Sequence, residues 1–316
     1  MVAVARTVPA DDGVALHVEC DPADAAAADA GTPTVVFTHG FTGAVSTWSR
    51  QRETLRGRAP VVLWDQRGHG RSGGGPREHA TIDQTGRDLG AVLDAAVPTG
   101  RVVLVGHSMG GMSILALAGQ RPELFEDRVA GVLLLATPAG TMQWDQGPGV
   151  LITYVQRSGL MPALFAMLGL AAPLLDTVPW RRGVVGRWLC RHLFGDETDE
   201  EIRLAVRQQF EQLQVTTATG LWRTLLTPQR PPEWNALRRV PVAVVGGHDD
   251  RITPIRHSHR IREELGGDTE LVVVPHAGHA VVQTHRDDVD DALLRLLDRS
   301  SAGAPRATTA GIGAVG

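Results

Sequence analysis

The stretch that decides the fold is Val102-Val-Leu-Val-Gly106-His107-Ser108-Met109-Gly110-Gly111. Its first residues are apolar and mostly β-branched, as in a buried strand, and a helical pattern begins directly after Ser108. A Gly-x-Ser-x-Gly sequence between a strand and a helix is typical of a nucleophile elbow, a turn so tight that the serine backbone is strained. Gly106 and Gly110 lack a Cβ, so the strand and the helix can approach closely. We expect this turn to expose the Ser108 hydroxyl at the end of the strand, beside the backbone N–H of Met109.

Length and composition limit the class of protein. The chain has 316 residues, which suffices for one large α/β domain or for a core with an inserted subdomain. It is 43% hydrophobic and 21% charged, and its net charge of −4 gives no reason to expect a nucleic-acid partner. We expect free thiols at Cys20 and Cys190. The N-terminal residues lack a charged region followed by an apolar core, so we expect no signal peptide and a cytoplasmic location.

Apolar runs predict a central sheet. A hairpin is expected over residues 1–20, with its turn at 11–13. Continuous apolar runs suit parallel strands that are covered on both faces, and these are expected at 34–38, 61–65, 102–106, 129–137, 240–247 and 271–275. Periodic apolar spacing predicts helices at 81–96, 255–265 and 286–299. Residues 300–316 are rich in Ser, Gly, Ala and Thr, and we expect a flexible tail there.

Between about residues 139 and 235 the apolar runs typical of strands are absent, and the spacing of apolar residues is helical. We therefore predict an α/β core made of residues 1–138 and 236–299, with residues 139–235 inserted as a helical cap. Residues 159–175 are unusually apolar, but the run is shorter than the roughly 20 residues of a membrane span and contains Pro162 and Pro173. We expect no transmembrane segment here. A lid over an apolar pocket is the preferred interpretation, and an interfacial helix is the alternative.

The candidate chemistry lies where predicted strands end. A serine hydroxyl needs a base to take its proton, and the base needs an acceptor that fixes its tautomer. The chain supplies these groups in the order Ser108, Asp250, His279, each after a predicted strand. Because the carboxyl ends of parallel strands meet at one edge of a sheet, we expect the three side chains to lie together as a catalytic triad.

Two neighbouring pairs leave alternatives open. Only one of Asp249 and Asp250 can face His279, and Asp250 is preferred because it directly precedes Arg251-Ile-Thr-Pro254, which would turn the chain into the next helix. His276 competes with His279 as the base. His279 is preferred because the glycine before it permits a tight loop.

Two further loops follow predicted strands. Residues 34–38 lead into His39-Gly40-Phe41-Thr42-Gly43, where we expect the backbone N–H of Phe41 to join that of Met109 as an oxyanion hole. In the loop after residue 65, His69 is expected to be structural. There we also expect Asp65 and Arg67 to form a local ion pair. We expect no cofactor and no metal, because no group of His, Cys and Asp has metal-ligand spacing.

With these motifs the chain resembles an α/β-hydrolase-fold serine hydrolase of the esterase and lipase type with a helical cap. The stretches that carry the resemblance are His39-Gly-Phe-Thr-Gly43, Asp65-Gln-Arg-Gly-His-Gly-Arg-Ser72, Gly106-His-Ser-Met-Gly110, Asp250-Arg-Ile-Thr-Pro254 and Gly278-His279. The resemblance implies eight mostly parallel strands flanked by helices, with the cap inserted after the sixth. It also implies cleavage of carboxylic esters of a hydrophobic small molecule through an acyl-enzyme. A carbon–carbon bond hydrolase or a perhydrolase would use the same triad, and a non-catalytic binding protein is a third alternative.

Overall fold

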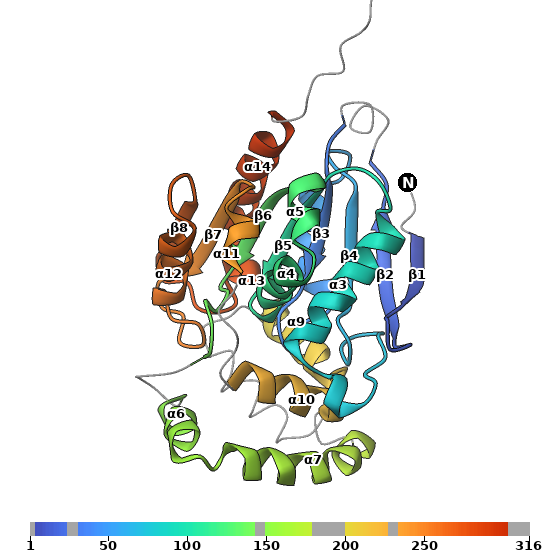
Figure 1. Cartoon of the computed structure of the whole chain (residues 1–316), viewed down its shortest axis with the longest axis vertical. Helices are drawn as coiled ribbons and strands as arrows, with labels where there is room; N and C mark the ends of the chain where they lie inside the picture. The colour runs from blue at the N-terminus through green and yellow to red at the C-terminus, as the bar shows by residue number, and fades with distance from the viewer. Residues whose placement is uncertain (1–3, 24–30, 143–148, 179–199, 227–232, 303–316) are drawn as a thin grey trace, which may run out of the picture.

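The computed structural model describes residues 4–23, 31–142, 149–178, 200–226 and 233–302 (Figure 1). A central sheet of eight strands has the order β1-β2-β4-β3-β5-β6-β7-β8. Its strands are β1 (Val4–Pro9), β2 (Ala15–Asp21), β3 (Thr34–Thr38), β4 (Val61–Trp64), β5 (Val102–His107), β6 (Val129–Leu135), β7 (Val242–Gly247) and β8 (Glu270–Val274). The β1–β2 and β2–β4 pairs are antiparallel, and every other neighbouring pair is parallel. The predicted fold class, a mostly parallel eight-stranded sheet flanked by helices, is confirmed.

Helices cover both faces of this sheet because its strands are apolar on both faces. One face packs against α3 (Ile82–Ala96), α4 (Met109–Gln120), α5 (Pro122–Asp127), α11 (Trp234–Leu237) and α12 (Arg256–Leu265). The other face packs against η1 (Val45–Trp48), α2 (Ser49–Thr54), α13 (Val281–Thr284) and α14 (Arg286–Ala302). Alternate residues of one strand enter opposite cores, as Val103 and Leu104 of β5 do. The result is a three-layer arrangement with the ends of β3, β5, β6, β7 and β8 at one edge.

The element boundaries follow local signals. Helix α3 begins after Thr81, whose hydroxyl accepts a hydrogen bond from the backbone N–H of Gln84 and so caps the helix. The final helix continues to Ala302, three residues beyond the predicted end at 299, because Ser300 is buried against the sheet. The rest of the predicted tail, residues 303–316, lies outside the described residues, as does Cys190. Cys20 is a free, partly buried thiol.

The inserted segment contributes four described helices. They are α6 (Gly149–Ser158), α7 (Met161–Thr177), α9 (Glu200–Glu211) and α10 (Val215–Leu226). Figure 1 shows α7 farthest from the sheet, with α10 between α7 and the core. Pro162 lies in the first turn of α7 and Pro173 lies inside it, so neither proline ends the helix. Ile202, Val206 and Phe210 lie on one face of α9 and are all buried.

Helix α10 rests directly on the backbone of the core. A Cβ on Gly68 would lie 2.4 Å from the Cβ of Thr217, and a Cβ on Gly220 would lie 2.5 Å from the carbonyl oxygen of Arg77. The N–H of Gln214, just before α10, donates to the carbonyl of Gly68 at 2.8 Å. Glycine is therefore required on both sides of this contact. The contact fixes α10 relative to the loop that follows β4.

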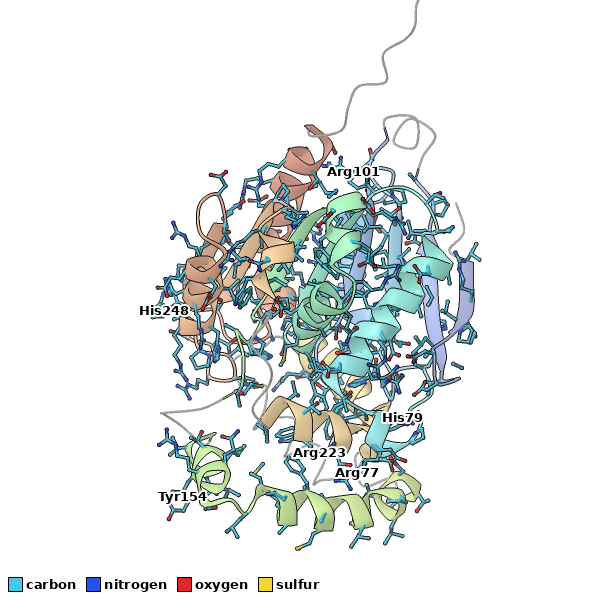
Figure 2. All side chains as sticks on the ribbon, viewed as in Figure 1. Arg77, His79, Arg101, Tyr154, Arg223 and His248 are labelled. Atoms are coloured by element: carbon cyan, nitrogen blue, oxygen red, sulfur yellow. The ribbon has the colours of Figure 1, made fainter. Side chains whose placement is uncertain are left out.

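Helices α6 and α7 expose large apolar side chains on their outer side. Leu170 is 85% exposed, and Tyr154 is 70% exposed and projects from α6 (Figure 2). No single helix within the described ranges is long and apolar enough to cross a membrane. Residues 150–158 and 161–177 reach that length and composition only as a pair, and the pair is bent by 108°. On the inner side, Arg77 donates to the carbonyl of Phe165 in α7 at 2.6 Å.

Candidate active site

The turn between β5 and α4 consists of Ser108 alone. Its backbone angles are φ 51° and ψ −116°, a conformation that a non-glycine residue rarely adopts. A Cβ on Gly106 would lie 2.6 Å from the backbone nitrogen of Gly111, and a Cβ on Gly110 would lie 2.0 Å from the carbonyl oxygen of Thr38. The two glycines are therefore needed for the strand, the helix and the neighbouring loop to meet here. Ser108 is 6% exposed and lies at the N-terminus of α4.

The structure brings Ser108, His279 and Asp250 together. The Oγ of Ser108 lies 3.0 Å from Nε2 of His279, and Nδ1 of His279 lies 2.9 Å from Oδ2 of Asp250. A carboxylate can only accept, so Nδ1–H of His279 donates to Asp250 and Nε2 is left to accept the Ser108 proton. The three groups come from the ends of β5, β7 and β8. This geometry permits proton transfer from the hydroxyl to the imidazole.

The Asp250 carboxylate is held by a compact turn. Its Oδ1 accepts the backbone N–H groups of Ile252 and Thr253, both at 2.8 Å. Thr253 Oγ1 lies 2.6 Å from Oδ2 of Asp250 and 2.9 Å from the carbonyl oxygen of Ala136. Burial alone would raise the pKa of Asp250, but the charge of His279 and these hydrogen bonds together hold that pKa below its usual value. Asp250 is therefore ionised beside His279.

Sequence reasoning missed Thr253. The signal was present, because Asp followed by Thr three residues later is typical of a local side-chain turn. The two residues that competed for site positions lie elsewhere. Asp249 is exposed and pairs with His248 at 2.6 Å. His276 has a side chain that is 93% exposed and lies 3.9 Å from Asp249.

The loop after β3 lies against the turn at Ser108. A Cβ on Gly40 would lie 3.2 Å from the Cβ of Ser108. The loop turns at Phe41 and Thr42, where the N–H of Gly43 donates to the carbonyl of Gly40 at 3.0 Å. Among the described residues, the backbone N–H of Phe41 has no hydrogen-bond partner, and neither has that of Met109.

Three other histidines near this site are buried: His39, His69 and His107. His39 lies 2.7 Å from the carbonyl oxygen of Gly40 through Nδ1, and His107 lies 3.0 Å from the carbonyl oxygen of His279 through Nε2. Burial lowers the pKa of His39 to about 4, and burial, assisted by neighbouring rings, lowers the pKa values of His69 and His107 to about 3. All three rings are neutral at ordinary pH and act as fixed hydrogen-bonding groups.

The predicted ion pair between Asp65 and Arg67 is wrong. Arg67 is fully buried and contacts Asp88 at 2.6 Å and Asp12 at 2.9 Å. The Asp65 carboxylate instead accepts the backbone N–H of Val45 at 2.7 Å. The error arises because β4 ends at Trp64, so the chain turns after Asp65 and two residues only two positions apart face different partners. His69 is buried, and its ring nitrogens lie beside Arg67 and Thr42, so it occupies a structural position, as the sequence predicted.

An apolar cluster connects Ser108 to the inserted helices. Met109 and Met112 of α4 pack with Met161 and Phe165 of α7. Further members of this cluster are Met142, Leu221, Leu225 and the partly buried Phe41, Trp222 and Ile252. Methionine side chains are flexible and fill irregular spaces, so a cluster rich in them can adapt to apolar groups of different shape. No group of His, Cys, Asp and Glu in the described ranges could hold a metal ion.

Comparison with known proteins gives the family. A family model described as the alpha/beta hydrolase family matches residues 35–292. The chain belongs to the alpha/beta hydrolase family. The match includes every element that supplies Ser108, Asp250 and His279. The sequence resemblance to this fold is confirmed.

Relatives of this alpha/beta hydrolase have several activities. The chain is 28% identical over 273 residues to a dihydrolipoyllysine-residue acetyltransferase component of an acetoin cleaving system from Pseudomonas putida, covering 85% of this chain but only 64% of that protein. It is 25% identical over 272 residues to 2-hydroxy-6-oxo-6-(2'-aminophenyl)hexa-2,4-dienoic acid hydrolase from Metapseudomonas resinovorans, covering 85% of each. An esterase structure from Thermogutta terrifontis has a TM-score of 0.70 at 22% identity, covering 95% of this chain and all of that one. An enol-lactonase structure from Burkholderia xenovorans has a TM-score of 0.66 at 20% identity, covering 93% and 100%.

Proposed function

We propose that this alpha/beta hydrolase is a serine hydrolase that cleaves carboxylic esters of a hydrophobic small molecule through an acyl-enzyme. The observation that carries the proposal is the continuous line of contacts from Ser108 Oγ to His279 Nε2 at 3.0 Å and from His279 Nδ1 to Asp250 Oδ2 at 2.9 Å. A nucleophile within reach of a base that is itself oriented by a third group is the pattern of nucleophilic catalysis. The strained backbone of Ser108 adds support, because such strain collects at active sites.

The reaction proceeds in two balanced steps. His279 Nε2 takes the proton of Ser108 as its Oγ bonds to the ester carbonyl carbon, and the oxyanion forms near the N–H groups of Phe41 and Met109. The carbon–oxygen bond to the alcohol then breaks, and the alcohol leaves with the proton from Nε2. In the second step water gives a proton to Nε2 as its oxygen bonds to the acyl carbon. The bond to Oγ breaks, Ser108 regains the proton, and the acid is released.

The nature of the substrate is inferred from the methionine-rich cluster beside Ser108. We propose that residues 139–235 act as a cap whose inner side chains, such as Met161 and Phe165, accept the apolar part of the ester. The same triad would serve a carbon–carbon bond hydrolase, and the relative named as a dienoic acid hydrolase favours that as the second candidate.

The test compares wild type with Ser108→Ala on a panel of p-nitrophenyl esters of increasing acyl length and one vinylogous diketone. We expect ester hydrolysis to fall by at least about a thousandfold in the variant, with unchanged circular dichroism. A fluorophosphonate should label wild type and not the variant. Turnover of the diketone with little ester hydrolysis would assign the second candidate. Equal ester hydrolysis by the two proteins would refute Ser108 as the nucleophile, and binding without turnover of any panel member would indicate a non-catalytic protein.

A further inference from the structure

The turn that contains Phe41 is strained at the residue that follows it, Thr42. Thr42 has φ 67°, in the left-handed region that a β-branched residue avoids, and it is buried. Glycine or asparagine ordinarily occupies such a position. A strained turn of this kind persists only when its surroundings hold it. The direction of the Phe41 N–H therefore depends on what contacts the turn from outside.

His69 contacts both residues of this turn. Its Nε2 lies 3.2 Å from the backbone nitrogen of Thr42, and its ring meets the ring of Phe41 edge-on with centroids 5.7 Å apart. Its Nδ1 lies 2.9 Å from the carbonyl oxygen of Arg67. A carbonyl can only accept, so Nδ1 carries the proton and Nε2 is the acceptor for the Thr42 N–H. The neutral tautomer required by these two bonds is the form that burial favours.

The ring of Phe41 also contacts a helix of the inserted segment. Trp222 of α10 meets the Phe41 ring edge-on, with centroids 5.4 Å apart. Because α10 is seated on the backbone at Gly68, the residue next to His69, both contacts of Phe41 come from one connected unit. The Phe41 ring thus contacts both His69 and Trp222.

We propose that His69 is a positioning residue for the oxyanion hole: its Nε2 fixes the Thr42 amide and thereby aims the adjacent Phe41 N–H at the reacting carbonyl. This inference rests on the proposed function and adds a residue to it. His69 touches no reacting atom. It acts through the turn, and only one of its two hydrogen bonds has this effect, which makes the two bonds separable by substitution.

The experiment uses two amide variants of the full-length protein. In His69→Gln the amide oxygen reaches the place of Nε2 and can accept the Thr42 N–H, while the bond to Arg67 is lost. In His69→Asn the shorter amide can donate to the Arg67 carbonyl but does not reach Thr42. We expect His69→Asn to lower kcat by about tenfold or more with KM within about twofold, because removal of one oxyanion donor typically lowers kcat by about 10²–10³. His69→Gln should retain kcat within about threefold.

A second measurement excludes loss of folded protein as the cause. Active sites are titrated with a p-nitrophenyl phosphonate, so kcat is expressed per working site. A trifluoromethyl ketone, which forms a tetrahedral adduct on the serine, should bind His69→Asn more weakly by a factor similar to the loss in kcat. If His69→Asn yields little folded protein, the titration is applied to the fraction that folds, so that kcat and the affinity for the ketone are still expressed per working site.

Three results overturn the inference. Equal losses in the two variants, or a larger loss in His69→Gln, would show that the Arg67 bond is the important one. Wild-type affinity of His69→Asn for the ketone would show that the oxyanion site is undisturbed. Wild-type kcat in both variants would show that His69 is dispensable. These outcomes are distinct from failure of the proposed function, since the ester hydrolysis of wild type and of Ser108→Ala decides that separately.

Discussion

Lowering the pH should destabilise this protein through its buried neutral histidines. The pKa of His107 falls to about 3 in the folded chain, against the ordinary value of 6.5, and those of His69 and His39 fall to about 3 and about 4. As the pH falls below about 6.5, these three rings therefore bind protons in the unfolded chain but not in the folded chain. The stability of the folded state is complete above about pH 6.5 and declines as the pH falls toward the folded pKa values.

The size of the effect follows from linkage. Each ring that stays neutral in the folded state lowers the free energy of unfolding by about 2 kcal/mol when the pH falls from about 7 to about 5. The carboxylates with lowered pKa values, such as Asp12 and Asp250, act in a lower pH range, because their contribution is lost only as the pH falls below their ordinary values. The three histidines together therefore account for a loss of about 6 kcal/mol in this interval.

The assay is urea unfolding followed by tryptophan fluorescence at the two pH values. His107→Gln retains an amide donor for the carbonyl of His279 but cannot take up a proton, so the loss between the two pH values should shrink by about 2 kcal/mol. His259→Gln is the matched control, because His259 is exposed and solvated in both states. If His107→Gln loses as much stability as wild type between the two pH values, His107 is not held neutral in the folded chain.

Two further predictions concern carboxylates. Asp250→Asn should lower kcat by about 10⁴, because the imidazole loses its orienting acceptor. Asp249→Asn should keep kcat within about threefold of wild type, since Asp249 is exposed. Steady-state ester kinetics measure both values, and a larger loss in Asp249→Asn would exchange the roles of the two residues. Arg67→Met leaves the buried Asp88 and its neighbour Asp12 without their cation, and should lower the unfolding free energy by about 3–5 kcal/mol. Unfolding in urea measures this, and a midpoint equal to that of wild type would contradict it.

Much of the architecture was predictable because the parallel strands are largely continuous apolar runs, and several of them stop at glycine or a polar residue. The strand at 34–38 was predicted with its observed ends, and those at 61–65 and 271–275 within one residue. The short helix α13, Val281–Thr284, was missed because four residues carry too little periodicity to detect. Pro173 does not end α7, which continues to Thr177.

The candidate site was predictable only in part. Chain order and strand ends brought Ser108, Asp250 and His279 into one hypothesis, because parallel topology gathers strand ends at one edge. The supporting contacts were not predictable in the same way. The bond from His69 to Thr42 joins residues 27 positions apart in two different loops, and nothing in either loop alone indicates which nitrogen faces which amide. Such contacts depend on how loops stack after the sheet has formed.

The close contact of α10 with the backbone at Gly68 and Arg77 has a consequence for protein engineering. In chain order α10 belongs to the insertion, but it also contacts the backbone of the segment after β4, at Gly68 and Arg77. Exchange of the insertion between homologues would therefore pack a different helix against a backbone surface that fits α10. A chimera that transfers residues 66–80 together with the insertion keeps both sides of this contact. Such a chimera should fold better than one in which only the insertion is exchanged.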